Sequence, residues 1–348
     1  MKILVTGGIG FIGSHLVDLL IEKKHDIRIL VRKGKVHKAY NSSKGPEIIE
    51  YMKKLGVEIV YGNLLDKKSL EKAVKDCETV YHLAAIAHTY QGLPRKVYFD
   101  VNVQGTKNLL DACLKNKVKK FVYVSTIESC GPSLDGKPIN ETKKPNPVNV
   151  YGQSKLGGEV ISLYYYKKYG LPVVVVRPPM IYGDRNPLLV RLFRTVKKGI
   201  FPIFGSGNSL FEFCYVKNQT YGIYLASERG KIGEVYFISE GSHRIKDVVK
   251  ATGEVMGVDL KIVYIPKTIG YTIGLSFEVL SKIFPFSPFR VRETGRPYIT
   301  RRTIKWTTND LYICDISKAK SQLGYKPLFS LQDGLERTIK WYKEKKLL

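Results

Sequence analysis

A glycine-rich turn near the amino terminus constrains the fold of this chain more than any other feature. The turn has the sequence TGGIGFIG, follows an apolar segment over residues 2–6, and opens a segment with apolar residues at helical spacing. In such a strand–turn–helix unit, Gly7 permits the tight turn, Gly10 lets the backbone approach a pyrophosphate, and Gly13 lets helix and strand pack closely. The positive end of the helix dipole then favours the phosphates. The motif therefore predicts a dinucleotide-binding α/β unit.

Strand-like and helix-like segments alternate along the first half of the chain. The strand-like segments are dense in valine, isoleucine, leucine and tyrosine, which is typical of parallel strands buried on both faces. They lie at residues 2–6, 26–31, 57–60, 78–82, 119–124 and 172–177. After about residue 180, proline and glycine separate shorter elements, which indicates a smaller lobe.

These patterns predict an α/β fold, with a doubly wound parallel Rossmann sheet and a smaller C-terminal substrate lobe. We expect the dinucleotide-binding Rossmann domain to comprise residues 1–178, rejoined by strands at about 234–239 and 311–316. The substrate-binding lobe is expected to comprise residues 179–233, 240–310 and 317–348.

The cysteine spacing and the net charge of the chain limit the sites and partners that we expect. The five cysteines form no CxxC pair, so we expect reduced thiols, no metal site and a cytoplasmic location. The net charge of +26 arises from scattered lysines, which favours a lysine-rich surface over a dedicated anionic partner. No nucleic-acid-binding motif is present, so no nucleic-acid partner is expected. The apolar residues 265–290 favour a lobe helix over the substrate cleft, with peripheral membrane contact as the alternative.

Tyr151 and Lys155 are the candidate catalytic pair. They are four residues apart, so on a helix both side chains project from one face. The pKa of a tyrosine is ordinarily about 10, which makes it a poor base at neutral pH. A neighbouring lysine cation favours the phenolate, and we therefore expect Lys155 to ready Tyr151 for proton exchange with a substrate alcohol or carbonyl.

Further motifs carry a resemblance to a known family. They are GNL at 62–64, YHLAA at 81–85, NVQGT at 102–106, YGQSK at 151–155, RPP at 177–179, DISKAK at 315–320 and LGYKP at 323–327. With the glycine turn, they resemble the extended short-chain dehydrogenase/reductases of the NAD-dependent epimerase/dehydratase superfamily, nearest to the 3β-hydroxysteroid dehydrogenase and dihydroflavonol reductase-like branch. The resemblance covers nearly the whole chain and implies an NAD(P)-dependent enzyme.

The resemblance also implies roles for individual residues. It makes Thr126 the third catalytic residue, and it places Glu128 where dehydratases carry an additional acid or base. The residues implied to bind the cofactor are Gly7, Gly10, Phe11, Ile12, Gly13, Arg32, Lys33, Asn63, Leu64, Leu83, Ala84, Ala85, Asn102, Tyr151, Lys155, Pro178 and Pro179. Asn102 is expected to bond backbone in the neighbouring helix as well.

The second strand indicates which dinucleotide is preferred. NAD-dependent enzymes place an acid at its end, where the carboxylate accepts a hydrogen bond from the ribose 2′-hydroxyl. In this chain Val31 stands there, followed by Arg32 and Lys33. Because a guanidinium binds a 2′-phosphate with charge-assisted hydrogen bonds, NADP(H) is favoured, with NAD(H) as the alternative.

The substrate is harder to predict. Enzymes acting on UDP-sugars usually carry Asn and Arg, which hold the diphosphate, where this chain has Met180 and Phe211. With Thr126 and Glu128, these two residues are the candidate substrate contacts. The apolar replacements favour hydride transfer at a secondary alcohol or ketone of a bulky, partly apolar or lipid-linked substrate.

Two alternatives stay open. The first is a sugar-nucleotide 4-epimerase or dehydratase with no net redox change, in which Glu128 is an extra acid or base. The second is a catalytically silent, cofactor-bound regulatory or nucleic-acid-binding protein. By resemblance alone, helices expected over 95–116 and 148–169 would form the interface of a homodimer.

Overall fold

A computed structural model describes residues 1–32, 45–87, 93–186, 189–284, 297, 299–308 and 311–348. Its larger part is a sheet of seven strands in the order β10-β6-β5-β4-β1-β2-β3, with every neighbouring pair parallel. These strands are β1 (Lys2–Thr6), β2 (Asp26–Val31), β3 (Glu58–Tyr61), β4 (Thr79–His82), β5 (Lys120–Val124), β6 (Val173–Arg177) and β10 (Val235–Phe237). The predicted doubly wound parallel sheet is confirmed.

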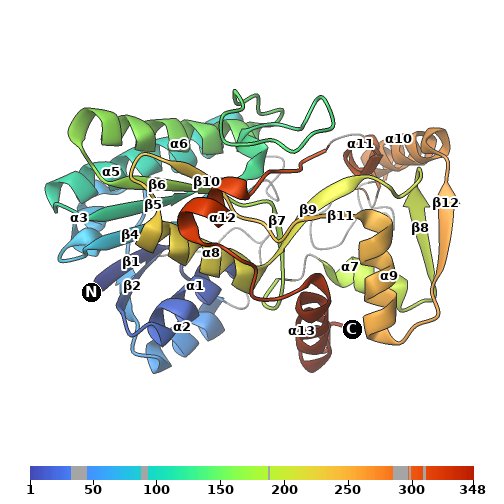
Figure 1. Cartoon of the computed structure of the whole chain (residues 1–348), viewed down its shortest axis with the longest axis horizontal. Helices are drawn as coiled ribbons and strands as arrows, with labels where there is room; N and C mark the ends of the chain where they lie inside the picture. The colour runs from blue at the N-terminus through green and yellow to red at the C-terminus, as the bar shows by residue number, and fades with distance from the viewer. Residues whose placement is uncertain (33–44, 88–92, 187–188, 285–296, 298, 309–310) are drawn as a thin grey trace.

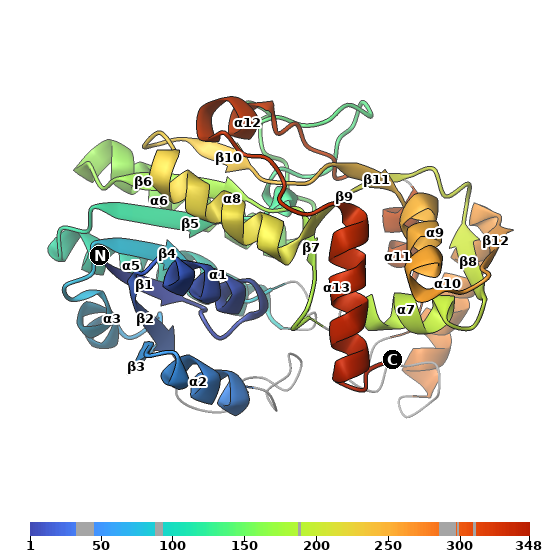
Figure 2. The ribbon, with the colours of Figure 1, turned by 60° about the horizontal axis from the view of Figure 1, so that its bottom comes forward.

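Helices cover both faces of this sheet (Figures 1 and 2). One face carries α1 (Phe11–Glu22), α2 (Gly45–Lys54), α8 (Val216–Arg229) and α12 (Ser317–Leu323). The other carries α3 (Lys67–Val74), α5 (Gly105–Lys115) and α6 (Val150–Tyr169). A short helix, α4 (Arg95–Phe99), and a π-helical turn over Asp100–Gln104 lead into α5. Because both faces of the strands are covered, their side chains need no polar alternation.

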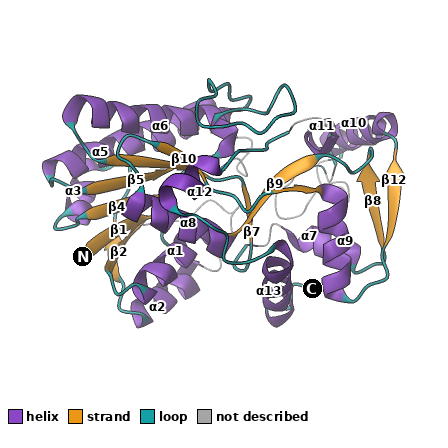
Figure 3. Ribbon diagram, viewed as in Figure 1, coloured by secondary structure: helices purple, strands orange, loops and turns teal. Residues whose placement is uncertain are grey.

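The smaller lobe is built on two further sheets (Figure 3). The strands β7 (Met180–Tyr182), β9 (Leu210–Tyr215) and β11 (Ser242–Arg244) form one, in the order β11-β9-β7. The other pairs β8 (Ile200–Phe204) with β12 (Lys261–Ile265) in parallel. The lobe's helices are α7 (Val190–Val196), α9 (Ile245–Met256), α10 (Lys267–Ile283), α11 (Arg301–Thr308) and α13 (Leu331–Glu344).

The structure departs from the sequence prediction at residues 311–316. Within the described part of the chain, this segment adds no strand to the seven-stranded sheet; Leu311 and Cys314 make single bridges to Ser133 and Ile139. Its apolar pattern reflects burial, because Cys314 packs with Ile139 and Phe237 in a small core. The segment is buried, as its apolar residues indicate. It does not pair with the seven-stranded sheet, and that part of the prediction is wrong. The remaining division into domains stays a prediction.

Candidate active site

The glycine turn has the geometry of a narrow backbone cradle. Gly7 has φ +76°. The Gly10 amide donates a 2.9 Å hydrogen bond to the Gly7 carbonyl. A Cβ atom on Gly13 would lie 2.1 Å from that same carbonyl oxygen. Helix α1 begins at Phe11 with no acidic residue in its first turn. The first-turn N–H groups lack intrahelical acceptors, so the turn fits an anionic group.

The loop after β4 lies beside this turn and is held by Asn102. The amide of Ala84 donates to Thr6 Oγ1 at 3.3 Å. Asn102 accepts a 2.7 Å hydrogen bond from the Ile86 amide and donates to the Ile86 carbonyl at 3.0 Å. It also donates to Ser154 Oγ at 2.9 Å. Asn102 is buried, so these bonds tie the loop to helix α6.

A buried histidine extends this network. Thr106 Oγ1 donates to the Asn102 carbonyl at 2.8 Å, so it accepts a hydrogen bond from His82 Nε2, which lies 2.9 Å away. His82 Nδ1 is then the acceptor of the 2.7 Å bond from Thr6 Oγ1. Burial, with a smaller contribution from the charge of Lys155, lowers the pKa of His82 to about 3. A neutral His82 therefore connects Thr6, at the start of the glycine turn, with Thr106 of helix α5.

Four of the residues predicted to bind the cofactor follow the ends of β2 and β3. Arg32 follows β2 and is exposed, whereas Lys33 lies outside the described residues. Asn63 is exposed, and its Oδ1 accepts a 3.1 Å hydrogen bond from the Leu65 amide. Leu64 is buried, against Gly105 of α5.

Thr126, Glu128 and Tyr151 come together at the carboxyl end of β5. Asn149 caps α6 by accepting from the Gly152 amide at 2.8 Å, and its Nδ2 donates to Glu128 Oε2 at 2.6 Å. The Thr126 hydroxyl hydrogen-bonds the Tyr151 side chain, and it also accepts from the Glu128 amide at 3.3 Å. A hydroxyl, a carboxylate and a phenol therefore share one end of the sheet.

Burial dominates the electrostatics of this group. It raises the pKa of Tyr151 well above its ordinary value; the charge of Glu128 adds to the rise and the bond with Thr126 opposes it. Burial also lowers the pKa of Lys155 to about 7, against an opposing contribution from Glu159. The pKa of Tyr151 is therefore raised by desolvation, where the sequence led us to expect Lys155 to lower it.

Sequence analysis missed a buried ion pair one helical turn beyond Lys155. Arg177 Nε and Nη2 lie 3.1 and 2.5 Å from the carboxylate oxygens of Glu159, and both residues are at most 3% exposed. Tyr123 lies between the sheet and α6, with its ring centroid 4.4 Å from Lys155 Nζ. The spacing of Tyr151, Lys155 and Glu159, each four residues apart, was the signal that would have placed Glu159 on this face.

The predicted apolar contacts lie at the boundary with the lobe. Pro178 and Pro179 are buried, and the Pro178 carbonyl accepts a 2.7 Å hydrogen bond from the Ile127 amide. Met180 on β7 is half-buried, whereas Phe211 on β9 is 3% exposed within the lobe core. Met180 therefore presents more surface than Phe211 to a substrate.

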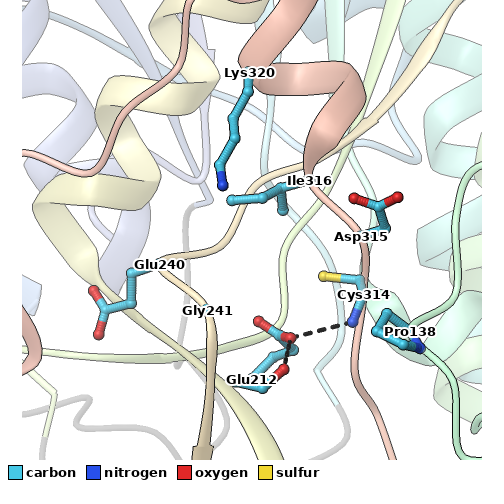
Figure 4. Close-up of a pocket in the computed structure, with 9 residues that line it drawn as sticks. Pro138, Glu212, Glu240, Gly241, Cys314, Asp315, Ile316 and Lys320 are labelled. Carbon is cyan, nitrogen blue, oxygen red and sulfur yellow. Dashed lines mark hydrogen bonds between the residues drawn. The ribbon is translucent and has the colours of Figure 1, made fainter.

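A separate pocket of about 350 Å³ lies between β9, β11 and the segment before α12 (Figure 4). Glu212 accepts hydrogen bonds from the Ser239 and Ser242 hydroxyls and a 3.2 Å bond from the Cys314 amide. Burial raises the pKa of Glu212. None of the predicted site residues lines this pocket, and its buried carboxylate joins the lobe to residues 314–316.

Comparisons with known proteins converge on one family. The model of the NAD dependent epimerase/dehydratase family matches residues 3–239. A dTDP-glucose 4,6-dehydratase of Actinoplanes sp. is 30% identical, over 99% of this chain and 98% of that protein. A 3beta-hydroxysteroid-dehydrogenase/decarboxylase of Arabidopsis thaliana is 28% identical, over 97% of this chain and 78% of that protein. The crystal structure of the UDP-glucuronic acid 4-epimerase of Bacillus cereus in complex with NAD has a TM-score of 0.76 and 27% identity, and 99% of each chain is covered.

Proposed function

The chain belongs to the NAD dependent epimerase/dehydratase family, and from this premise we propose that it is a sugar-nucleotide 4-epimerase or dehydratase without net redox change. Family membership confirms the superfamily recognised from the motifs, and the protein is an enzyme. Similarity to a dTDP-glucose dehydratase and a UDP-glucuronic acid epimerase supports this function better than the net oxidation or reduction favoured by the sequence. The catalytically silent alternative is thereby dropped.

A nicotinamide dinucleotide fits the glycine turn, because the close approach of Gly13 to Gly7 leaves no space for side chains, and the first turn of α1 lacks acids. The turn over residues 7–13, the loop over 83–85 and Lys155 would hold it. A nicotinamide held there would supply a reversible hydride acceptor for the substrate.

In this proposal, Tyr151 takes the proton of the substrate hydroxyl that becomes a carbonyl, and returns it in the reverse step. Thr126 donates a hydrogen bond to the same oxygen and orients it. Burial disfavours the phenolate of Tyr151. In this proposal a protonated Lys155 would favour it. Because the pKa of Lys155 is about 7, we expect the rate to fall as pH rises above 7 and this lysine loses its proton.

Glu128 is the observation that favours a dehydratase over a simple alcohol dehydrogenase. Its carboxylate is half-buried, is held by Asn149 at 2.6 Å, and raises the pKa of Tyr151, so its charge acts at the reacting group. In a dehydratase, Glu128 would remove a proton from the carbon next to the new carbonyl. A simple alcohol dehydrogenase has no step that needs this second base.

One observation supports the competing function, an alcohol dehydrogenase or reductase with net use of cofactor. Met180 is half-buried on β7, where an asparagine would hold a sugar-nucleotide diphosphate. An apolar thioether there suits a bulky, partly apolar alcohol that is oxidised or reduced with net use of cofactor.

Absorbance at 340 nm, measured together with product analysis by NMR, tests the proposal. The purified enzyme is incubated with dTDP-glucose, UDP-glucose or UDP-glucuronic acid. We expect product to form without a stoichiometric change in reduced cofactor. Stoichiometric cofactor turnover with a secondary alcohol, and no reaction of any sugar nucleotide, would overturn it.

Two substitutions separate the roles of the site residues. Tyr151→Phe removes the phenol hydroxyl and is expected to lower the rate of any product at least about 100-fold. Glu128→Gln keeps the hydrogen-bonding shape of the side chain. It is expected to stop dehydration while a keto-sugar or reduced cofactor still forms, and to leave an epimerase nearly unaffected. Glu71→Gln on the surface of α3 is the matched control.

The preference for NADP(H) and the homodimer remain part of this proposal. The solved Bacillus cereus epimerase holds NAD, while the exposed Arg32 and the absence of an acid at Val31 support NADP(H). Dissociation constants for both dinucleotides, before and after Arg32→Ala, test the preference for NADP(H); tighter binding of NAD by the parent enzyme would refute it.

The exposed Val160 and Tyr164 on α6 suit a dimer interface. Light scattering measures the oligomeric state and tests the proposed homodimer.

A further inference from the structure

Helix α10 exposes several large apolar residues and fully buries only small ones. Its buried residues are Gly270, Gly274 and Ser281, all small. At about 100° per residue, these fall on one side of the helix, and the large apolar residues Ile269 and Val279 fall on the opposite side. A helix at the surface of a globular protein normally does the reverse.

The small residues let α10 approach α11 closely. A Cβ atom on Gly274 would lie 2.7 Å from the Arg301 amide nitrogen, and one on Gly270 would lie 2.7 Å from the Phe204 ring. Glu278 accepts from the Arg301 amide at 2.9 Å and pairs with its guanidinium at 2.8 Å. These inner contacts fix the orientation of α10. They leave Ile269, Leu275, Val279 and Ile283 exposed, whereas Ile273, Phe277 and Leu280 are partly buried.

The outward residues form what we term the lobe-tip apolar surface. It consists of Ile269 (50% exposed), Leu275 (44%), Val279 (45%), Ile283 (61%) and Phe284 (53%). Figure 1 shows α10, β8 and β12 together at the end of the lobe away from the seven-stranded sheet. Ile200 and Val263, on these two strands, are 55% and 39% exposed. Single exposed apolar residues are ordinary, but four on one helix and a fifth directly after it indicate an interaction surface.

The charges around this surface identify its partner. Within 261–284 and 299–308, the only acidic residue is Glu278, and Arg301 already pairs with it. Six basic residues lie in the same two segments, and all of them are exposed: Lys261, Lys267, Lys282, Arg301, Arg302 and Lys305. A second copy of the chain would bring these like charges together, whereas an anionic surface would be attracted to them.

We propose that the lobe-tip apolar surface docks the enzyme on an anionic lipid bilayer. The large side chains of α10 enter the boundary between headgroups and acyl chains, and the flanking lysines and arginines contact lipid phosphates. Such a helix lies in the plane of the bilayer. The described residues contain no helix long and apolar enough to cross a membrane. Docking is independent of the chemistry proposed above, since no predicted catalytic residue takes part.

Sedimentation with lipid vesicles tests the proposal. The full-length protein is mixed with vesicles of equal parts phosphatidylglycerol and phosphatidylcholine, or of phosphatidylcholine alone, at about 0.1 M and about 0.5 M salt. We expect binding to the anionic vesicles that weakens at high salt, and little binding to phosphatidylcholine. Failure of the parent protein to bind anionic vesicles at low salt would overturn the proposal.

A matched pair of variants distinguishes this surface from general adhesion by a basic protein. The triple variant Ile269→Ser, Val279→Ser, Ile283→Ser is expected to weaken binding about ten-fold or more, because it removes apolar area that the bilayer would bury. The control Leu134→Ser, Leu328→Ser changes residues that are 85% and 56% exposed elsewhere, and should bind as the parent does. Circular dichroism is used to check that both variants fold.

Two results would contradict the docking surface. One is equal loss of vesicle binding in the control and the triple variant. The other is a triple variant that dissociates an oligomer in light scattering and keeps full vesicle binding, because the surface would then be a contact between copies. Vesicle binding needs no substrate, so a wrong assignment of the reaction leaves this test intact.

Discussion

Replacing Lys155 by methionine removes a charge that folding takes out of water. The side chain is 2% exposed, and burial lowers its pKa from 10.5 to about 7. At 1.36 kcal/mol per pH unit, this fall corresponds to at most about 5 kcal/mol of unfavourable free energy when the lysine is protonated. Methionine has a similar length and no charge. It forfeits the contact of the ammonium with the Tyr123 ring, which is worth about 1 kcal/mol.

The pH dependence of this effect has a definite sign. The pKa of Lys155 is lower in the folded chain than in the unfolded chain, so between pH 7 and 10.5 the unfolded chain binds more protons. The parent protein therefore gains stability from this group as pH rises through that range. Below pH 7 the lysine is protonated in both states, and the full penalty is present.

We therefore expect Lys155→Met to raise the free energy of unfolding by about 4 kcal/mol at pH 6. At pH 9 the expected gain is only about 1 kcal/mol. Urea denaturation at the two pH values measures both quantities. Lys68→Met, at an exposed position on α3, is the control and should change stability by less than about 0.5 kcal/mol. A Lys155→Met protein that is no more stable than the parent at pH 6 would refute the reasoning. So would a gain that is the same at pH 9.

Three other substitutions have expected outcomes. Gly13→Ala brings a Cβ atom to 2.1 Å from the Gly7 carbonyl, so dinucleotide affinity should fall at least about ten-fold in a fluorescence titration; unchanged affinity would contradict the cradle. Glu159→Gln leaves the buried guanidinium of Arg177 without its counter-charge, and should cost about 3–5 kcal/mol in urea denaturation. Asn102→Ala removes three buried hydrogen bonds, and should cost about 1–3 kcal/mol, with loss below 0.5 kcal/mol counting against the network.

Much of the fold was predictable because the signals are local. The strand, the glycine turn and the first turn of α1 are contiguous, so spacing alone placed them. The segment at 311–316 shows the limit. Its apolar residues predicted burial, but the bridges of Leu311 and Cys314 to Ser133 and Ile139 depend on a loop more than 170 residues earlier in the chain. Periodicity indicates that a face is apolar, and it carries no information on which element covers it.

The candidate site divides in the same way. From the sequence came the helical spacing that puts Tyr151 and Lys155 on one face, and the helix that carries them is present as α6. The tertiary structure alone decided their ionisation, since burial raises the pKa of Tyr151 and lowers that of Lys155 against the sequence-based expectation. Desolvation depends on elements from β4 to β6 closing around these groups. The same closure pairs Glu159 with Arg177. Packing in the lobe likewise leaves large apolar residues of α10 exposed, because only packing determines which face of a helix is covered.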